Sequence, residues 1–177
     1  MKSQSSFEVK PLGERDWPVL KSLVDCVWPV TFKNILSEEQ IAYMMEFMYS
    51  TASLKKQVET GSRFYILYEA AEPIGYLALI PNYRNEKLSK EGSWMKVDKL
   101  YVMPENHGTG AGRFLMDFAF AEAKKENLQG VMLNVNRDNK AVKFYEYYGF
   151  KTAYSGDFDI GKGYLMQDYI MVYPFKE

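Results

Sequence analysis

The sequence is poor in the residues that build redox and metal chemistry. Its 177 residues include one cysteine, Cys26, and one histidine, His107. A single cysteine cannot close a disulfide within the chain, which fits a reducing compartment. The same scarcity excludes a multi-histidine metal cluster and a four-cysteine zinc site inside one chain, so we expect no metal. A Ser-His-Asp triad would have to take its only imidazole from a glycine-rich segment, so we do not expect one.

An excess of charge of one sign is also lacking, as are long hydrophobic runs. Lys and Arg number 22 and Asp and Glu 23, so no basic surface for nucleic acid is predicted. No apolar run approaches the roughly 18 residues of a membrane span. The first ten residues, MKSQSSFEVK, lack the apolar core of a signal peptide. We expect a single cytoplasmic domain over residues 1–177, with no nucleic-acid or membrane partner.

A glycine-rich segment in the middle of the chain is the most informative feature that is present. Residues 96–126 begin as a strand that ends at Pro104, pass through glycines at 108, 110 and 112, and become a helix near Arg113. Glycine lets the backbone approach a phosphate and adopt positive φ. The unpaired N–H groups at a helix start attract negative charge. This order predicts an anion-binding loop, although a turn that binds nothing has the same composition.

Three kinds of phosphate-binding loop compete for this segment. A dinucleotide-binding Gly-x-Gly-x-x-Gly counted from Gly108 would end on Arg113, and the chain lacks the Gly-Lys-Ser/Thr tripeptide of a Walker loop. The run HGTGAG, from His107 to Gly112, favours a third interpretation. It resembles the pyrophosphate loop of the GNAT acyltransferases, Gln/Arg-x-x-Gly-x-Gly/Ala, with His107 in the place of Gln or Arg.

A second motif supports this third interpretation. Residues 139–150 read NKAVKFYEYYGF. They resemble the closing GNAT motif, Asn-x-x-Ala-x-x-Phe/Leu-Tyr-x-x-x-Gly-Phe, with one residue fewer between Asn139 and Ala141. As a physical pattern, the segment predicts a short helix that is capped at its start by Asp138 or Asn139 and ended by Gly149. In their order and spacing, the two motifs resemble the GNAT N-acetyltransferase superfamily over about the C-terminal half of the chain.

The remaining patterns predict the order β-α-α-β-β-β-α-β-α-β-β, with a further short helix at 53–61. The expected strands are 7–11, 63–69, 74–80, 95–103, 131–136, 151–159 and 164–173, and the expected helices are 14–27, 38–49, one from 113 and one in the second motif. The resemblance implies an α+β GNAT fold, a mixed and mostly antiparallel sheet with helices on both faces. It also implies that two central strands splay apart around the thioester arm of acetyl-CoA.

The resemblance further implies site residues, with acetyl-CoA as co-substrate. Tyr145 resembles the family tyrosine that protonates the leaving thiolate. Asp98 is our expected general base, and Glu146, Tyr101 or a chain of waters are alternatives. On a regular strand, Asp98 shares a face with Leu100 and Val102 while Tyr101 faces the other way, and a bulge would change this. The implied cofactor contacts are Leu100, Tyr101, Val102, His107, Gly108, Thr109, Gly110, Ala111, Gly112, Arg113 and Asn139.

The family's acceptor enters between the early helices and the final strands. These segments supply aromatic and acidic side chains, which attract ammonium groups, and we select Trp28, Tyr43, Tyr164 and Asp168 as substrate-binding. We therefore expect an N-acetyltransferase that acts on a small amine or polyamine. A protein or peptide N-acetyltransferase and a non-catalytic acyl-CoA-binding sensor are the alternatives, and a homodimer stays open.

Overall fold

The computed structural model describes residues 6–175, so the first five residues of the N-terminal segment considered above lie outside it. Its centre is a seven-stranded sheet of order β1-β2-β3-β4-β5-β7-β6. All neighbouring strands are antiparallel except β4 and β5, which run parallel. The expected mixed, mostly antiparallel sheet is confirmed. The strands are β1 (Phe7–Pro11), β2 (Arg63–Glu69), β3 (Glu72–Tyr83), β4 (Trp94–Val102), β5 (Gly130–Asn136), β6 (Lys151–Asp159) and β7 (Leu165–Pro174).

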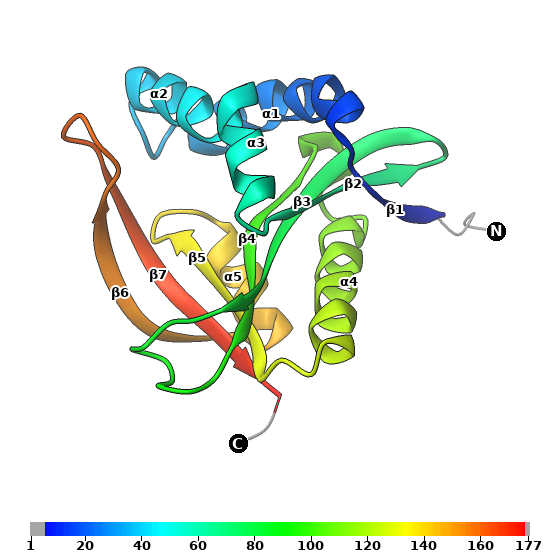
Figure 1. Cartoon of the computed structure of the whole chain (residues 1–177). Coiled ribbons are helices and arrows are strands. Elements are labelled where there is room, and N and C mark those ends of the chain that lie inside the picture. Colours follow the sequence, from blue (N-terminus) through cyan, green and yellow to red (C-terminus); the bar gives the residue numbers. More distant parts are fainter. Residues whose placement is uncertain (1–5, 176–177) are drawn as a thin grey trace.

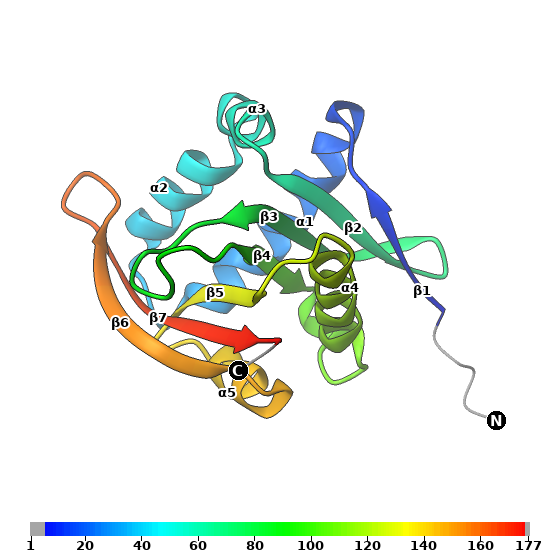
Figure 2. The ribbon, with the colours of Figure 1, turned by 60° about the horizontal axis from the view of Figure 1, so that its bottom comes forward.

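The helices cover both faces of this sheet. They are α1 (Trp17–Phe32), α2 (Glu38–Tyr49), α3 (Thr51–Glu59), α4 (Ala111–Lys125) and α5 (Ala141–Tyr148), with short 3₁₀ turns at Glu14–Asp16 and Pro104–Asn106. Helices α1, α2 and α3 lie together on one face, and α4 and α5 lie on the other (Figures 1 and 2). Along β2, Phe64 and Ile66 pack into the α1–α3 layer, whereas Tyr65 and Leu67 pack into the α4–α5 layer. The period-two alternation of a strand therefore divides the core into two layers.

Helix α1 is longer than the sequence predicts. It was expected to end at Val27 but continues to Phe32, although Pro29 lies inside it. Proline removes one backbone hydrogen bond, and the burial of Trp28 and Phe32 in the core offsets this loss. Even so, none of the helices between residues 6 and 175 is long and apolar enough to cross a membrane.

Helix α5 ends at the glycine that the second motif predicts. Gly149 has a φ of +124°, and its N–H donates to the carbonyl of Glu146 at 3.1 Å. The N–H of Phe150 donates to the carbonyl of Tyr145 at 3.0 Å. These two bonds form a Schellman motif, which satisfies carbonyls that the helix end leaves free.

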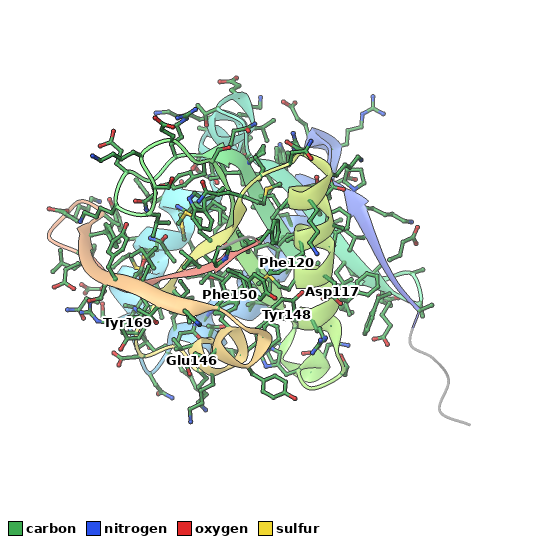
Figure 3. The ribbon with its side chains drawn as sticks, turned by 90° about the horizontal axis from the view of Figure 1, so that it is seen from below. Asp117, Phe120, Glu146, Tyr148, Phe150 and Tyr169 are labelled. Carbon is green, nitrogen blue, oxygen red and sulfur yellow. The ribbon has the colours of Figure 1, made fainter. Side chains whose placement is uncertain are left out.

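An aromatic cluster fixes α5 against α4. The hydroxyl of Tyr148 donates to Oδ1 of Asp117 on α4 at 2.5 Å. The ring of Phe120 lies 5.0 Å from that of Tyr148 and 5.8 Å from that of Phe150, and Figure 3 shows the four side chains together. The position of every residue on α5 is therefore tied to the helix that follows the glycine loop.

Replacing Gly149 with alanine is expected to lower the free energy of unfolding by about 2–5 kcal/mol, from positive φ and overpacking together. The new Cβ would lie 2.7 Å from Cε2 of Tyr173. Gly163→Ala is the matched control, since its φ is also positive and no atom lies within 4 Å of its Cβ position. Urea unfolding measures both variants. Equal losses of unfolding free energy in the two variants would show that the close contact with Tyr173 adds nothing to the cost of Gly149→Ala.

Candidate active site

The sheet opens between β4 and β5 because these strands pair over three residues only. Residues 95–97 pair with 131–133. Beyond them, β4 remains paired with β3 as far as Val102, and β5 remains paired with β7 as far as Asn136. The two facing strand ends therefore present backbone groups that have no partner strand. The splay implied by the family resemblance is present.

Backbone N–H groups on β4 point into this gap. The N–H of Met103 donates to Ile74 of β3 at 2.7 Å, and successive backbone groups of a strand point to opposite sides. The N–H groups of Leu100 and Val102 therefore point toward β5. The carbonyl of Val102 accepts a hydrogen bond from Nε2 of His107 at 2.9 Å, so His107 ties the glycine loop to the end of β4.

The glycine loop forms a cradle of backbone amides at the start of α4. Gly108 and Gly110 have φ of +77° and +91°, and no atom lies within 4 Å of either Cβ position. Helix α4 begins at Ala111, two residues before the expected start. Within the described part of the chain, the N–H groups of residues 108–113 have no hydrogen-bond partner. Free amides, open space and a helix dipole together suit a phosphate group.

Tyr145 and Tyr101 approach the gap from opposite faces of the sheet. Tyr145 on α5 is 7% exposed, and burial keeps the pKa of its hydroxyl well above the ordinary value. Tyr101 on β4 packs against Trp28 and Tyr76 of the other layer. Burial, Tyr49 and then Tyr145 raise the pKa of Tyr101. Both phenols are therefore protonated at neutral pH.

A β-bulge in β4 changes the face on which Asp98 lies. Pairing with β3 skips Asp98, so that Lys99 takes the next position. Leu100 and Val102 pack into the α4–α5 layer, whereas Tyr101 packs into the α1–α3 layer. Asp98 lies with Lys99 and Tyr101, so the face assignment predicted for a regular strand is wrong.

Asp98 is engaged by two lysines. Its carboxylate lies 2.5 Å from Nζ of Lys99 and 3.7 Å from Nζ of Lys96. Burial disfavours its charge, but the two lysines outweigh burial and lower the pKa of Asp98. A carboxylate held ionised in this way is a poor proton acceptor. Pairing of Asp98 with Lys96 or Lys99 is the structural alternative to a catalytic role for Asp98, and the adjacent Asp-Lys pair that interrupts the apolar alternation of the strand is its signal in the sequence.

The expected acceptor residues divide into buried and accessible ones. Trp28 is 1% exposed and donates from Nε1 to the hydroxyl of Tyr49 at 3.0 Å, which makes it a core residue. Tyr43 on α2 donates to the carbonyl of Ile160 at 2.7 Å, and its ring lies 5.2 Å from that of Tyr164. The tip of the β6–β7 hairpin therefore rests against α2 (Figure 1).

Asp168 lies next to a pocket on the same side of the sheet. The pocket has a volume of about 280 Å³ and is lined by the α1–α2 segment, Tyr164 and Asn136. Asp168 pairs with Asn136 across β7 and β5. It is 6% exposed, and its Oδ1 has no hydrogen-bond partner among residues 6–175. Burial raises the pKa of Asp168 to about 6, against the opposing effects of Asn134, Lys96 and Arg137.

The remaining expected residues lie around α5. Oδ1 of Asn139 accepts from the N–H of Ala141, the first residue of α5, at 2.9 Å, while the N-cap is Lys140 and makes no side-chain cap. A cavity of about 610 Å³ lies between α5, β6 and β7 and is lined by Lys143, Glu146 and Tyr169, among others. Figure 3 labels Glu146 and Tyr169. Glu146 therefore lines a different cavity from the one beside Asp168.

Comparison with known proteins assigns the family. A model of the acetyltransferase (GNAT) domain matches residues 32–172. The chain therefore belongs to the GNAT acetyltransferase family, as the two motifs indicated. PaiA N-acetyltransferase from Thermoplasma acidophilum, in complex with coenzyme A, has the same fold, with a TM-score of 0.75 at 24% identity over 96% of this chain and 99% of that chain.

Two curated relatives cover less of the chain. An uncharacterised N-acetyltransferase of Mycobacterium tuberculosis is 38% identical over 79 residues, which are 44% of this chain and 50% of that protein. A peptidyl-lysine N-acetyltransferase of Salmonella typhimurium is 31% identical over 105 residues, which are 58% of this chain and 59% of that protein. The chain thus spans about half the length of the curated relatives it matches.

Proposed function

We propose that the protein transfers the acetyl group of acetyl-CoA directly to a primary amine. The observation that carries this proposal is the convergence of three features in a chain of the GNAT family. The amide cradle of residues 108–113 follows β4, the edges of β4 and β5 are open to each other, and Tyr145 lies close enough to Tyr101 to raise its pKa.

The residues present fit this co-substrate. Unpartnered amides at 108–113 suit a pyrophosphate, and the open space at Gly108 and Gly110 leaves room for it. The N–H groups of Leu100 and Val102 then bind the thioester arm along the gap. His107 and Asn139 support the site indirectly, since each side chain is bonded to the protein's own backbone.

The chemistry follows from the protonation state of the acceptor. A primary amine has a pKa of about 10.4, so it must lose a proton before it attacks the thioester carbon. Holding the two reactants together in the gap contributes several kcal/mol, and β4 amides stabilise the developing oxyanion. Tyr145 donates its proton to the leaving sulfur, whose negative charge is disfavoured in the same buried setting.

The acceptor favoured by the site is a small amine or polyamine. Tyr43 and Tyr164 place aromatic rings beside the 280 Å³ pocket, and Asp168 places a carboxylate behind it. Both groups attract cations. Peptidyl lysine is the second candidate, because the Salmonella relative is named for it and the lysine side chain is itself a primary amine on an apolar stem. A non-catalytic acyl-CoA sensor would bind CoA and turn over no amine.

Gly110→Asp is expected to weaken CoA binding at least about tenfold, since it adds a negative charge to the amide cradle. Calorimetry with CoA measures the effect. Gly61→Asp is the matched control, because Gly61 also has positive φ and open space at its Cβ position but lies between α3 and β2. If the Gly110 variant binds CoA as tightly as the wild type, the loop does not hold the pyrophosphate.

Tyr145→Phe is expected to lower kcat by about 10²–10⁴-fold, because it deletes the proton donor and keeps the ring. The affinity for acetyl-CoA should change little. Tyr147→Phe is the control, since the side chain of Tyr147 is 87% exposed on the neighbouring position of α5. An unchanged kcat for Tyr145→Phe, measured where chemistry limits the rate, would remove this hydroxyl from the mechanism.

A panel of acceptors is expected to give saturable CoA release with diamines or polyamines at a higher kcat/KM than with lysine peptides or N-terminal peptides. The aromatic rings and the carboxylate at this pocket attract ammonium groups, which is the physical reason. Saturation by a lysine peptide with every free amine inert would establish the second candidate. CoA binding without turnover of any amine would establish the sensor.

A further inference from the structure

Asp168 is a buried carboxylate that the surrounding protein satisfies only in part, since the side chain of Asn134 acts on it as a hydrogen-bond partner and lowers its pKa. The carboxylate is on β7, 6% exposed, and its Oδ1 has no hydrogen-bond partner within residues 6–175. Leaving a buried polar atom without a partner costs free energy. Such an atom is retained at functional sites, where a ligand supplies the missing partner.

The position of Asp168 is on the acceptor side of the gap. Its neighbours Tyr169 and Met171 pack into the α4–α5 layer, so Asp168 faces the α1–α3 layer. There it lies close enough to Tyr101 to raise the pKa of that phenol, as Tyr145 does from the other side. Asp168 and Tyr145 therefore lie on opposite faces of the sheet, and both are close to Tyr101.

The other titratable groups considered for proton removal are already engaged or line another cavity. Asp98 is held by Lys96 and Lys99. Glu146 lines the cavity between α5, β6 and β7. His107 donates its Nε2 proton to the carbonyl of Val102. Asp168 combines burial, a free oxygen and proximity to the gap, and none of these three groups does.

We propose that Asp168 is the general base that takes the proton from the attacking amine nitrogen. This assignment rests on the proposed acetyl transfer. The ammonium form of the acceptor first loses one proton to solvent. The neutral amine then attacks the thioester carbon, a C–N bond forms, and the C=O π pair moves to oxygen. Asp168 accepts the N–H proton, directly or through one water. The oxyanion pair returns, the C–S bond breaks, and the sulfur leaves with the electron pair and takes the proton of Tyr145. The proton on Asp168 returns to Tyr145 through solvent, so both groups are restored.

The protonation of Asp168 supports this role. Burial raises its pKa to about 6, so the group is ionised at neutral pH and more basic than an ordinary carboxylate. The rate should therefore rise with pH through about 6, well below the ionisation of the amine near 10. The charged and titratable groups that face Asp168 or border its site are Lys96 and Tyr101 of β4, Arg137 and Asp138 after β5, and Asp157 of β6.

Asp168→Asn tests the proposal through the pH profile of kcat/KM for the best amine. We expect kcat at pH 7 to fall about 10²–10⁴-fold, the rise through pH 6 to disappear, and the affinity for CoA by calorimetry to stay unchanged. Asp25→Asn, which removes an exposed carboxylate of α1 that has no role in the site, is the control and should keep the wild-type profile. Asp168→Glu keeps a carboxylate, so it should retain the rise of the rate with pH, at a reduced rate. This variant still tests the proposal if Asp168→Asn does not fold.

Three results would overturn the assignment. A wild-type rate and profile for Asp168→Asn would exclude Asp168 from proton transfer. A raised KM with kcat and the rise through pH 6 retained would make it an ammonium-binding residue only. Loss of the rise in Asp168→Glu, in a folded protein that binds CoA, would exclude the carboxylate as the titrating group. If the wild type turns over no amine at all, both the proposed acetyl transfer and the assignment of Asp168 are rejected. The three results above reject the assignment of Asp168 alone.

Discussion

The short parallel pairing of β4 with β5 is the constraint on which the site depends. Three residue pairs hold the strands together, and each strand is then secured by its outer neighbour, β3 or β7. The sheet therefore opens without losing a strand, and the open edges keep their N–H groups free for a ligand. The same geometry sets the direction of the chain. The end of β4 leads into the glycine loop, so the amide cradle lies at the mouth of the gap.

The bulge at Asp98 explains why a carboxylate on the central strand is unsuited to proton transfer. It places Asp98 and Lys99 on one face, and Nζ of Lys99, which is 5% exposed, donates to the side chains of Asp98 and Gln57. Removing one member of such a buried pair leaves an uncompensated charge. The charge of Asp98 is thus paired with the two lysines, and the proposed general base is Asp168, whose Oδ1 has no partner among the described residues.

The sequence predicts the elements of this protein better than their irregularities. Ser37 and Gly149 fix helix ends by local chemistry that a short window contains, and both caps are present. The two motifs predict the glycine loop, α5 and the splay through the family resemblance. The bulge depends on pairing with β3, which no window of β4 contains. Trp28 was assigned to the acceptor site because aromatic residues suit cations, but it is buried in the α1–α3 layer, a fact of tertiary packing.

The division of the core into two layers also divides the chemistry. Tyr145 belongs to the α4–α5 layer and Tyr101 to the α1–α3 layer, and Asp168 lies on the face of β7 opposite to that of Tyr169 and Met171, which pack into the α4–α5 layer. A closed sheet would separate these groups, because side chains on opposite faces of a strand do not meet. The splay removes that barrier over a few residues only. In the proposed reaction, a thioester that enters from the cradle side and an amine that enters beside α2 meet where the strands part. The proposed proton donor and the proposed base then act from opposite faces of the sheet.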